Sequence, residues 1–480
     1  MPPAASTSVA IPPLPSPYRP DPAILALGDE FYDSVRSAAF PQAILRFRND
    51  LWAPAVGLDG LDDEAWIRHF ARFEPLPDNL REPLALRYHG HQFRAYNPDI
   101  GDGRGFLFAQ LRDGTDRLLD LGTKGSGQTP YSRFGDGRLT LKGAVRELLA
   151  TEMLEALGVE TSKTFSLIET GEALERNDEP SPTRSAVLVR LSHGHIRIGS
   201  FQRLAYLDQP DNVRKLTDYC LVTFFGEEGG EDGPARLLDH VVAGTARLAA
   251  AYIAAGFVHG VLNSDNINIT AESFDYGPWR WTPDWDGHFT AAYFDQFGLY
   301  SFGRQPEAIH WDVVQLAQSL RTIAEAEVLT TALETFPERF QKALRDALFR
   351  RLAIEPRDEA ADMALMVAIE EALAKRTVEI DRFFFDWRGG RRRGGSSADS
   401  AYDGEAFHPF RSLVADYRES EGALDHPYWS DPEPCSMHIE EVEEIWSRID
   451  ERDDWTGLYD KLGAVRRMGD AMRSRSRPDA

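Results

Sequence analysis

The stretch from His259 to Gly277, HGVLNSDNINITAESFDYG, concentrates oxygen-bearing side chains that suit a divalent cation. Mg²⁺ and Mn²⁺ take oxygen ligands, usually one or two protein side chains together with phosphates and water. Asn266 and Asp275 are therefore candidate metal ligands, and Asp265 is a candidate general base for an attacking hydroxyl. The alternative is an Asx turn at NSDN, because Asn and Asp side chains also bond their own backbone.

A short glycine-rich run, GDGRG, occupies residues 101–105 between two apolar stretches. Gly101 and Gly103 lack a Cβ, so the backbone N–H groups there can approach phosphate oxygens closely. Arg104 adds a bidentate donor that matches a phosphate. The flanking apolar runs predict two strands, and we expect the glycine loop at the tip of their hairpin. An ordinary tight turn is the alternative.

Lys124 ends a predicted strand, RLLDLGTK, and Glu147 lies on the helix predicted next, LTLKGAVRELLATEMLEALG, for which Gly158 is a suitable C-terminal cap. In protein-kinase-like folds a helix Glu holds the strand Lys that neutralises nucleotide phosphates. The order of glycine loop, Lys and Glu fits that arrangement. An exposed Lys and a solvated Glu are the alternative.

Two further arginines, Arg190 in AVLVRLS and Arg197 in HIRIG, could clamp terminal phosphates or could be surface strand residues. Two His-x-His pairs, at 89/91 and 193/195, could chelate a metal if they lie on strands. We identify no third ligand for them, and we expect packing or substrate contact instead.

The chain changes character along its length. Strands at TFSLIET and SAVLVRLS complete a β-rich first part, and the Ala-rich run DHVVAGTARLAAAYIAAG predicts a buried helix in a helical second part. RGGRRRGGSSADS lacks apolar residues and predicts a solvated linker whose arginines could bind an anion. The last part predicts an amphipathic helix at CSMHIEEVEEIWSRIDER and then a polar tail.

Composition restricts the function classes. The 480 residues carry 53 basic and 77 acidic side chains, a formal charge of −24, which disfavours nucleic acid as a partner. Two cysteines cannot build a disulfide framework or a cysteine-based zinc site. There is no signal peptide pattern and no run long enough to span a bilayer, so we expect a cytoplasmic protein without a membrane partner.

Together these motifs resemble the selenoprotein O family of pseudokinase-fold enzymes. The resemblance runs from about Phe31 to Leu320 and rests on YHGHQF, GDGRG, KGSGQTPYSRFGDGR, RELLATEMLEALG, GFVHGVLNSDN and DYGP in that order. It implies an α+β, bilobal protein-kinase-like fold. The expected parts are a disordered N-terminal tail (1–28), a β-rich N-lobe (29–200), a mainly helical C-lobe (201–387), a flexible linker or loop (388–404) and a C-terminal helical extension (405–480).

The resemblance also implies an activity. The enzyme would bind ATP in an inverted orientation with Mg²⁺ or Mn²⁺ and transfer AMP to Ser, Thr or Tyr hydroxyls of proteins, and UTP could replace ATP. Asp265 would be the base, Asn266 and Asp275 the metal ligands, and Glu147 the partner of Lys124. The nucleotide would contact Gly101, Gly103, Arg104, Lys124, Asp136, Gly137, Arg190, Arg197 and Asp275.

Val261 stands where a kinase carries its general base, two residues after the histidine. The reversed nucleotide accounts for this, because the α-phosphate instead of the γ-phosphate would face the acceptor. Many members of the family carry a C-terminal redox motif of the type Cys-x-x-Sec or Cys-x-x-Ser that can regulate the enzyme. Cys435 has no paired thiol after it, so redox control of this enzyme is not expected. Two other functions stay open: an ordinary phosphotransferase that uses the same ligands, and a nucleotide-binding scaffold without turnover.

Overall fold

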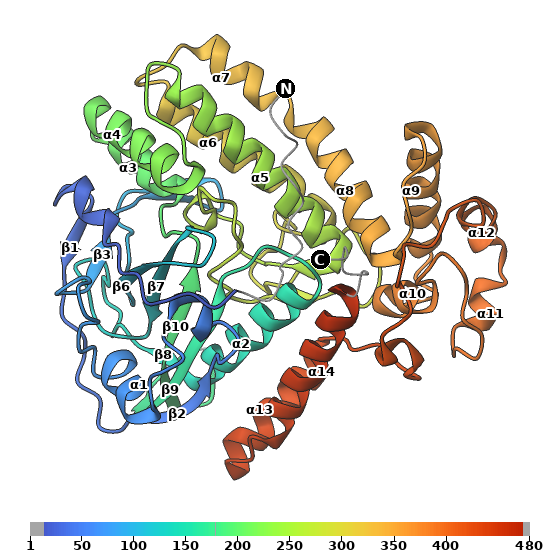
Figure 1. Ribbon diagram of the computed structural model, residues 1–480, viewed down its shortest axis with the longest axis horizontal. Coiled ribbons are helices and arrows are strands. Elements are labelled where there is room, and N and C mark those ends of the chain that lie inside the picture. Colours follow the sequence, from blue (N-terminus) through green and yellow to red (C-terminus); the bar gives the residue numbers. More distant parts are fainter. Residues whose placement is uncertain (1–13, 178, 474–480) are drawn as a thin grey trace.

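The computed structural model describes residues 14–177 and 179–473, and its first half is built on an antiparallel sheet (Figure 1). The strand order is β1-β3-β6-β7-β10-β9-β2, and β8 pairs with β10 beside this path. The strands are β1 (Tyr32–Ser34), β2 (Ile44–Arg48), β3 (Leu84–Leu86), β6 (Leu107–Arg112), β7 (Leu118–Lys124), β8 (Leu139–Thr140), β9 (Lys163–Leu174) and β10 (Thr183–Ser192).

The central strand β10 is buried on both faces, which explains its unbroken apolar sequence. Val187 and Val189 face a cluster that includes Trp66 of helix α1 (Asp63–Phe70). Leu188, one position out of phase, belongs to a second cluster that includes Leu148 of helix α2 (Leu141–Ala156). Successive strand side chains point to opposite faces, so covering both faces of the sheet removes the usual alternation with polar residues.

The second half is helical, and Figure 1 shows α5 to α8 as a layer beside the sheet, with α9 to α12 grouped beyond them. The helices are α3 (Ile198–Tyr206), α4 (Pro210–Cys220), α5 (Gly233–Ala255), α6 (Gln305–Leu320), α7 (Ala326–Leu333), α8 (Phe336–Leu352), α9 (Glu359–Leu373), α10 (Ile380–Asp386), α11 (Asp399–Tyr402), α12 (His408–Val414), α13 (Ile439–Arg452) and α14 (Thr456–Arg473). Two short hairpins complete the fold: β4 (Gly90–Gln92) with β5 (Ala95–Asn97), and β11 (Phe257–Val258) with β12 (Arg280–Trp281).

Helix α5 delivers the chain to the candidate chemistry. Its core-facing residues are buried, and Gly256 ends it in a left-handed conformation with φ +68°. A glycine is favoured there because a Cβ would be strained at this φ. The two strand residues of β11 follow directly and lead into His259 and the loop that carries Asp265.

Two expectations about the first half of the chain are wrong. Residues 14–28 are not a disordered tail, since Ile24 and Leu27 are 2% exposed in a 3₁₀ helix (Ala23–Leu27); residues 1–13 lie outside the described part. The glycine loop is not at a hairpin tip. Strands β3 and β6 do pair, at Leu84 and Leu107, but the chain between them forms its own hairpin, β4–β5, before the glycines.

The expected linker and polar tail also need correction. The segment from 388 to 404 begins buried, because Arg388 donates to the carbonyl oxygens of Arg350 and Arg351 and Arg393 stacks on Phe385 at 4.0 Å. The tail is instead helix α14, with Leu458, Val465 and other apolar residues buried. Residues 474–480 lie outside the described part.

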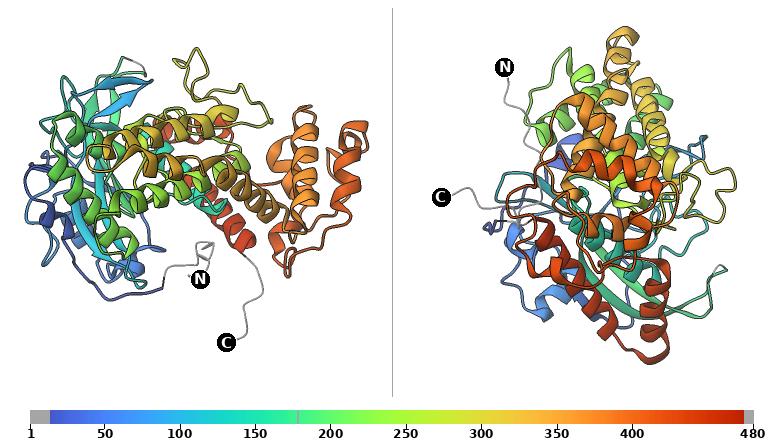
Figure 2. Two further views of the ribbon diagram at one scale, coloured as in Figure 1. Left: turned by 90° about the horizontal axis from the view of Figure 1, so that it is seen from above. Right: turned by 90° about the vertical axis from the view of Figure 1, so that its right-hand side faces the viewer.

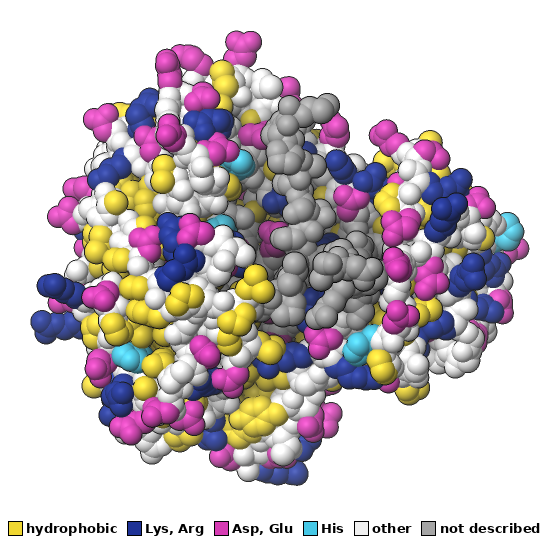
Figure 3. Space-filling view, viewed as in Figure 1, with side chains coloured by type: hydrophobic (Ala, Val, Ile, Leu, Met, Phe, Trp, Pro, Cys, Tyr) yellow, Lys and Arg dark blue, Asp and Glu magenta, His cyan; other side chains and the backbone are white. Residues whose placement is uncertain are grey.

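Acidic and basic side chains are interspersed over the face shown in Figure 3, so the net charge is not gathered into one field there. Within the described ranges, no helix combines the length and apolar character that a membrane span requires.

Candidate active site

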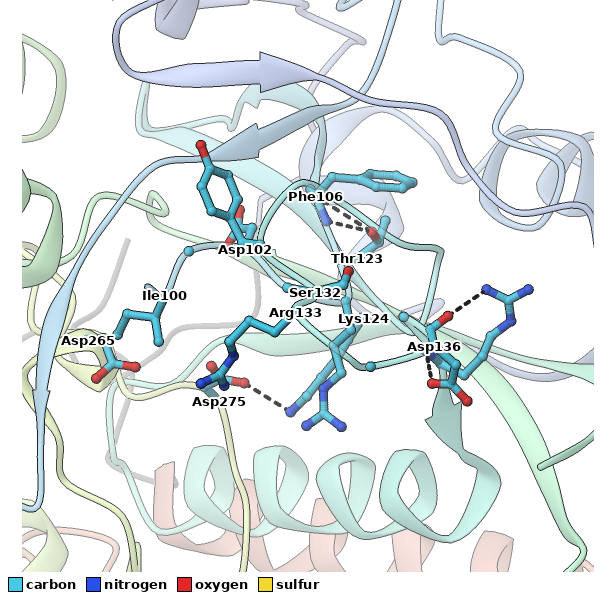
Figure 4. Close-up of a pocket in the computed structure, with 18 of the residues that line it drawn as sticks. Ile100, Asp102, Phe106, Thr123, Lys124, Ser132, Arg133, Asp136, Asp265 and Asp275 are labelled. Atoms are coloured by element: carbon cyan, nitrogen blue, oxygen red, sulfur yellow. Dashed lines mark hydrogen bonds and ion pairs between the residues drawn. The ribbon is translucent and has the colours of Figure 1, made fainter. Parts of the chain in front are cut away.

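A cavity of about 830 Å³ brings the predicted residues together from both halves of the chain. Its size is that of small-molecule sites in general. Ten of the predicted residues line it: Gly101, Gly103, Arg104, Lys124, Asp136, Gly137, Arg190, Arg197, Asp265 and Asp275. In the view of Figure 4, Asp265 and Asp136 lie toward opposite sides, with Asp275 and Lys124 between them and α2 below. Asn266 and Glu147 do not line the cavity.

The glycine loop lies against its neighbours so closely that side chains would not fit. A Cβ on Gly105 would lie 1.9 Å from the carbonyl oxygen of Thr123 on β7, and one on Gly101 would lie 2.5 Å from the ring of Tyr131. The loop backbone is thereby held over the end of β7, where Lys124 begins to enter the cavity. This is the close approach for which glycine is needed.

Lys124 and Glu147 form a buried ion pair, with 2.6 Å between Nζ and Oε2. Helix α2 places Glu147 there, and the Thr140 hydroxyl caps the helix by accepting a bond from the Gly143 N–H. Burying two charges is costly unless they are paired, so each side chain requires the other. Arg190 of β10 approaches the same carboxylate, with 3.7 Å from Nη1 to Oε1.

Asp275 stands at the centre of a cluster of cations. Lys124 lies 3.0 Å away, Arg197 3.2 Å and Arg190 3.6 Å. Burial opposes the ionised form, but the three cations outweigh it and hold the pKa of Asp275 well below its usual range. Its φ of +61° is uncommon outside glycine, so surrounding structure must fix it.

Arg197 connects this cluster to the loop of Asp265. One Nη1 hydrogen bond goes to the Asp265 carbonyl oxygen at 2.9 Å, and Nη2 lies 3.4 Å from the carboxylate of Asp102. Burial lowers the pKa of Arg197, but the nearby Tyr88, Asp275 and Asp102 raise it by more. The net shift of the pKa is upward, so Arg197 stays charged. Several buried donors here lack any hydrogen-bond partner: Arg190 Nε and Nη1 and Arg197 Nε. Such unpaired buried groups are what an anionic ligand would satisfy.

Asp265 has a different environment. It is 7% exposed, and its Oδ1 is buried without a hydrogen-bond partner. Burial raises the pKa of Asp265 to about 6, although Arg197 works against that shift. The loop around it is held by the β4–β5 hairpin, because the Ser264 hydroxyl accepts the His91 N–H at 2.7 Å. A Cβ on Gly90 would lie 2.8 Å from Asp265 Oδ1.

Asn266 and Asp275 offer the oxygen donors that a hard divalent cation takes. The Asn266 Nδ2 donates to the Val261 carbonyl at 3.0 Å, which leaves the amide oxygen as the available ligand atom. The donor set therefore fits Mg²⁺ or Mn²⁺. Across residues 14–177 and 179–473, no group of three or more His, Cys, Asp and Glu side chains converges as a metal site.

The four histidines of the His-x-His pairs have ordinary partners or packing. His89 Nδ1 bonds Tyr96 and His91 Nδ1 accepts from Gln202, while His195 Nδ1 lies 3.1 Å from Asp120. His193 packs edge-on against Phe224.

Asp136 and Gly137 lie at the other side of the cavity. Arg176 binds the Asp136 carboxylate at 2.8 and 3.2 Å, and the Arg138 N–H donates to it at 2.9 Å. Burial works in the opposite direction, but these bonds lower the pKa of Asp136. Gly137 has φ +69°, and a Cβ there would lie 2.3 Å from Gly127.

Sequence reasoning missed several of the lining residues, among them the charged residues Asp102, Arg133 and Arg176. Asp102 had a signal, since it stands between the two glycines of the phosphate-loop candidate. Arg133 lies in the SRFGDGR stretch, also beside a motif. No sequence pattern marked Arg176, because only the fold brings its segment against Asp136.

Comparison with known proteins agrees with this geometry. The family model described as "Protein adenylyltransferase SelO" matches residues 17–466. "Protein nucleotidyltransferase YdiU" of Synechocystis sp. is 48% identical over 340 residues, which are 70% of each chain. Proteins of the same name from Trichodesmium erythraeum and Gloeobacter violaceus are 42% and 41% identical, over 93% of this chain and 98% and 95% of theirs. The chain therefore belongs to the protein adenylyltransferase SelO family.

Proposed function

We propose that this protein transfers AMP from ATP to Ser, Thr or Tyr hydroxyls of other proteins. The observation that carries the proposal is the pairing, in one cavity, of unbonded guanidinium donors on Arg190 and Arg197 with the unbonded carboxylate oxygen of Asp265. The first kind of group suits a polyphosphate, and the second suits a proton acceptor.

The reaction that these groups support is in-line displacement at the α-phosphorus. The acceptor oxygen forms a bond to that phosphorus, the bond to the bridging oxygen breaks, and pyrophosphate leaves with its electron pair. Asp265 takes the hydroxyl proton. Lys124, Arg190 and Arg197 hold the phosphate charge, and preorganised charges of this kind supply most of the rate in phosphoryl chemistry.

Asn266 and Asp275 are the residues that would hold a divalent cation. When bound, such a cation neutralises phosphate charge and polarises the reacting phosphorus. Lys124 and Arg197 already face Asp275 at 3.0 and 3.2 Å, so a cation would share that carboxylate with them. Removing metal with EDTA should abolish transfer, and adding back Mg²⁺ or Mn²⁺ separately should identify the preferred ion.

The sheet region would be the N-lobe and helices α3 to α10 the C-lobe of a bilobal, protein-kinase-like fold. The cavity supports this division, because Lys124 and Arg190 come from strands while Asp265 and Asp275 come from the loop segments after α5. Binding of ATP in the inverted orientation would account for the absence of a base at Val261.

Label position tests the proposal directly. With [α-³²P]ATP the target proteins should become radioactive, and with [γ-³²P]ATP they should not. Retention of the γ label alone would instead identify a kinase, and binding of ATP without either label would identify a scaffold. [α-³²P]UTP with Mn²⁺ in a parallel reaction tests whether UMP is also transferred.

A further inference from the structure

Exposed aromatic side chains gather at one place in the molecule. In residues 14–177 and 179–473, seven Phe and Tyr side chains are exposed, and four of these are Phe93, Tyr293, Phe294 and Phe297. Tyr293 is 85% exposed and Phe297 is 93% exposed. Single apolar residues on a surface are common, whereas a cluster of large ones indicates a binding surface. We call these four residues the aromatic patch.

The patch joins two segments that are far apart in the sequence. Phe93 is at the turn of the β4–β5 hairpin, and the other three belong to the segment between β12 and α6, which extends from the body of the protein (Figure 2). The rings of Phe93 and Phe294 lie 5.8 Å apart, and those of Tyr293 and Phe294 lie 5.1 Å apart. These contacts join Phe93, Phe294 and Tyr293 into one surface, and Phe297 lies three residues after Phe294 on the same segment.

The patch is fastened to the loop that carries the proposed base. Asn263 Oδ1 accepts the Phe93 N–H at 3.1 Å and the Tyr300 hydroxyl at 2.8 Å. Asn263 is two residues before Asp265. The ring of Tyr300 also lies 5.0 Å from that of Phe93. A polypeptide bound at the patch would therefore lie beside the entrance to Asp265.

The segment is ordered although its aromatic side chains are exposed. Asp295 accepts the N–H groups of Leu299 and Tyr300, both at 2.8 Å, which fixes the turn after Phe294. Phe93 has φ +50°, a conformation that is costly for a bulky residue and persists only where surrounding contacts impose it. The fold thus keeps these aromatic rings exposed, although burying them would stabilise the protein.

The charge of the segment restricts what can bind. From 281 to 303 it has no Lys or Arg and carries Asp284, Asp286 and Asp295. The cations that border the segment are already paired, Arg376 with Asp286 and both Arg94 and Arg304 with Glu307. An acidic partner would therefore find no unpaired cation on the segment itself, whereas an apolar or basic one would meet no like charge there.

We propose that the aromatic patch docks the substrate polypeptide itself, as an extended segment with a large apolar side chain a few residues from the acceptor hydroxyl and no acidic residue beside it. This inference rests on the proposed function, since it assigns the protein substrate of that reaction. Rigid aromatic rings give a large contact area at low cost in side-chain entropy, which suits a surface that accepts many sequences.

Acceptor peptides test the inference. We would use peptides of Gly, Ala and Lys with a single Thr, and place one Phe at successive positions on either side of it. The matched control has Ala in place of Phe. With [α-³²P]ATP, at least one Phe peptide should show a KM about tenfold below that of the Ala peptide, as expected for one well-buried aromatic anchor. Replacing the Lys next to the Phe in that peptide with Glu should raise the KM of the peptide.

The enzyme variant Tyr293→Ser/Phe297→Ser should remove that preference. Both side chains are mostly exposed, so the fold should be retained. The kcat/KM for the best Phe peptide should fall about tenfold through KM, and that for the Ala peptide less than twofold. Leu51→Ser, at another exposed apolar residue, is the control and should change neither value.

The outcomes separate the inference from the function on which it rests. If the wild type labels no protein and no peptide with α-phosphate, the proposed function fails. If the wild type labels folded proteins but no peptide, the docking inference alone is wrong. The same holds if the wild type and the double variant each label the Phe and Ala peptides equally well. If sedimentation velocity shows a dimer that the double variant dissociates, with peptide kinetics unchanged, the patch is instead a contact between two copies.

Discussion

Asp275 lies between the Asp136 end of the cavity and Asp265 and is surrounded by three cations, whereas at the opposite end Asp265 keeps a carboxylate oxygen without any partner. Burial raises the pKa of both carboxylates, so the difference in their pKa shifts comes from their neighbours. The cations lower the pKa of Asp275, while burial raises that of Asp265. Neighbouring charge thus separates a carboxylate suited to bind cations from one suited to exchange a proton.

The contrast extends to what surrounds each end. The Asp275 end is bounded by β-strands and α2, with arginine donors that are free for phosphate oxygens. The Asp265 end is bounded by the β4–β5 hairpin, and the aromatic patch is fastened to the same loop. The two ends therefore match the two substrates, nucleotide and polypeptide, and each should fail in its own way when altered.

Asp275→Ala should have the largest effect. It removes a metal ligand and leaves Lys124, Arg190 and Arg197 without their shared counter-charge, so transfer of α-phosphate should fall by roughly a thousandfold or more. Calorimetric titration should show loss of Mn²⁺-dependent binding of α,β-methylene-ATP. Activity within tenfold of the wild type would contradict the assignment, and thermal unfolding controls for the fold.

Asp265→Asn should separate the two ends most clearly. The amide cannot accept the proton, so kcat should fall by about 10²- to 10⁴-fold. Affinity for α,β-methylene-ATP should stay within about threefold, because no phosphate-binding residue is changed. A variant that loses nucleotide affinity and kcat in proportion would show that Asp265 belongs to the nucleotide end.

Glu147→Gln should give an intermediate effect confined to the nucleotide end. The amide keeps the shape of the side chain but not its charge, while Lys124 keeps Asp275 as a partner at 3.0 Å. We expect the KM for ATP to rise by about tenfold, which corresponds to roughly 1.4 kcal/mol. The KM for the acceptor peptide should not change. Equal losses for both substrates would contradict the separation.

Local patterns made most of the nucleotide end predictable. The apolar spacing of 141–157 predicts α2 and places Glu147 after the strand of Lys124, and both are where they were expected. The hairpin that supports Asp265 was missed because its turn is Phe93-Arg94, both with positive φ, instead of the Asn-Gly that marks such turns. Its partners, Asn263 and Ser264, are about 170 residues away, so no local pattern shows the contact.

Helix α14 lies within the helical extension expected over 405–480, but its own residues were interpreted as a polar tail. Leu458, Leu462 and Val465 do recur at helical spacing, but charged residues between them hide the apolar stripe. That stripe packs on α2 and thereby supports the nucleotide end from behind. A substitution on α14 should therefore change the KM for ATP, although α14 lies outside the cavity.

The smallest effect should come from Arg466→Ala. Arg466 of α14 binds Glu152 of α2 with two bonds of 2.7 Å, and the Glu152 side chain is 6% exposed, so the variant leaves a buried carboxylate unpaired. We expect a loss of stability of roughly 1 kcal/mol and a KM for ATP about threefold higher, because α2 also carries Glu147.

Arg467→Ala is the matched control, since the next residue on the same helix pairs with Asp431 and not with α2. The exchange Glu152→Arg/Arg466→Glu should restore part of the KM if the pair positions α2. Were the unfolding temperature to fall with KM unchanged, α14 would only stabilise the fold. An increase in the KM for the acceptor peptide as large as that for ATP would instead mean that the two ends of the cavity respond as one.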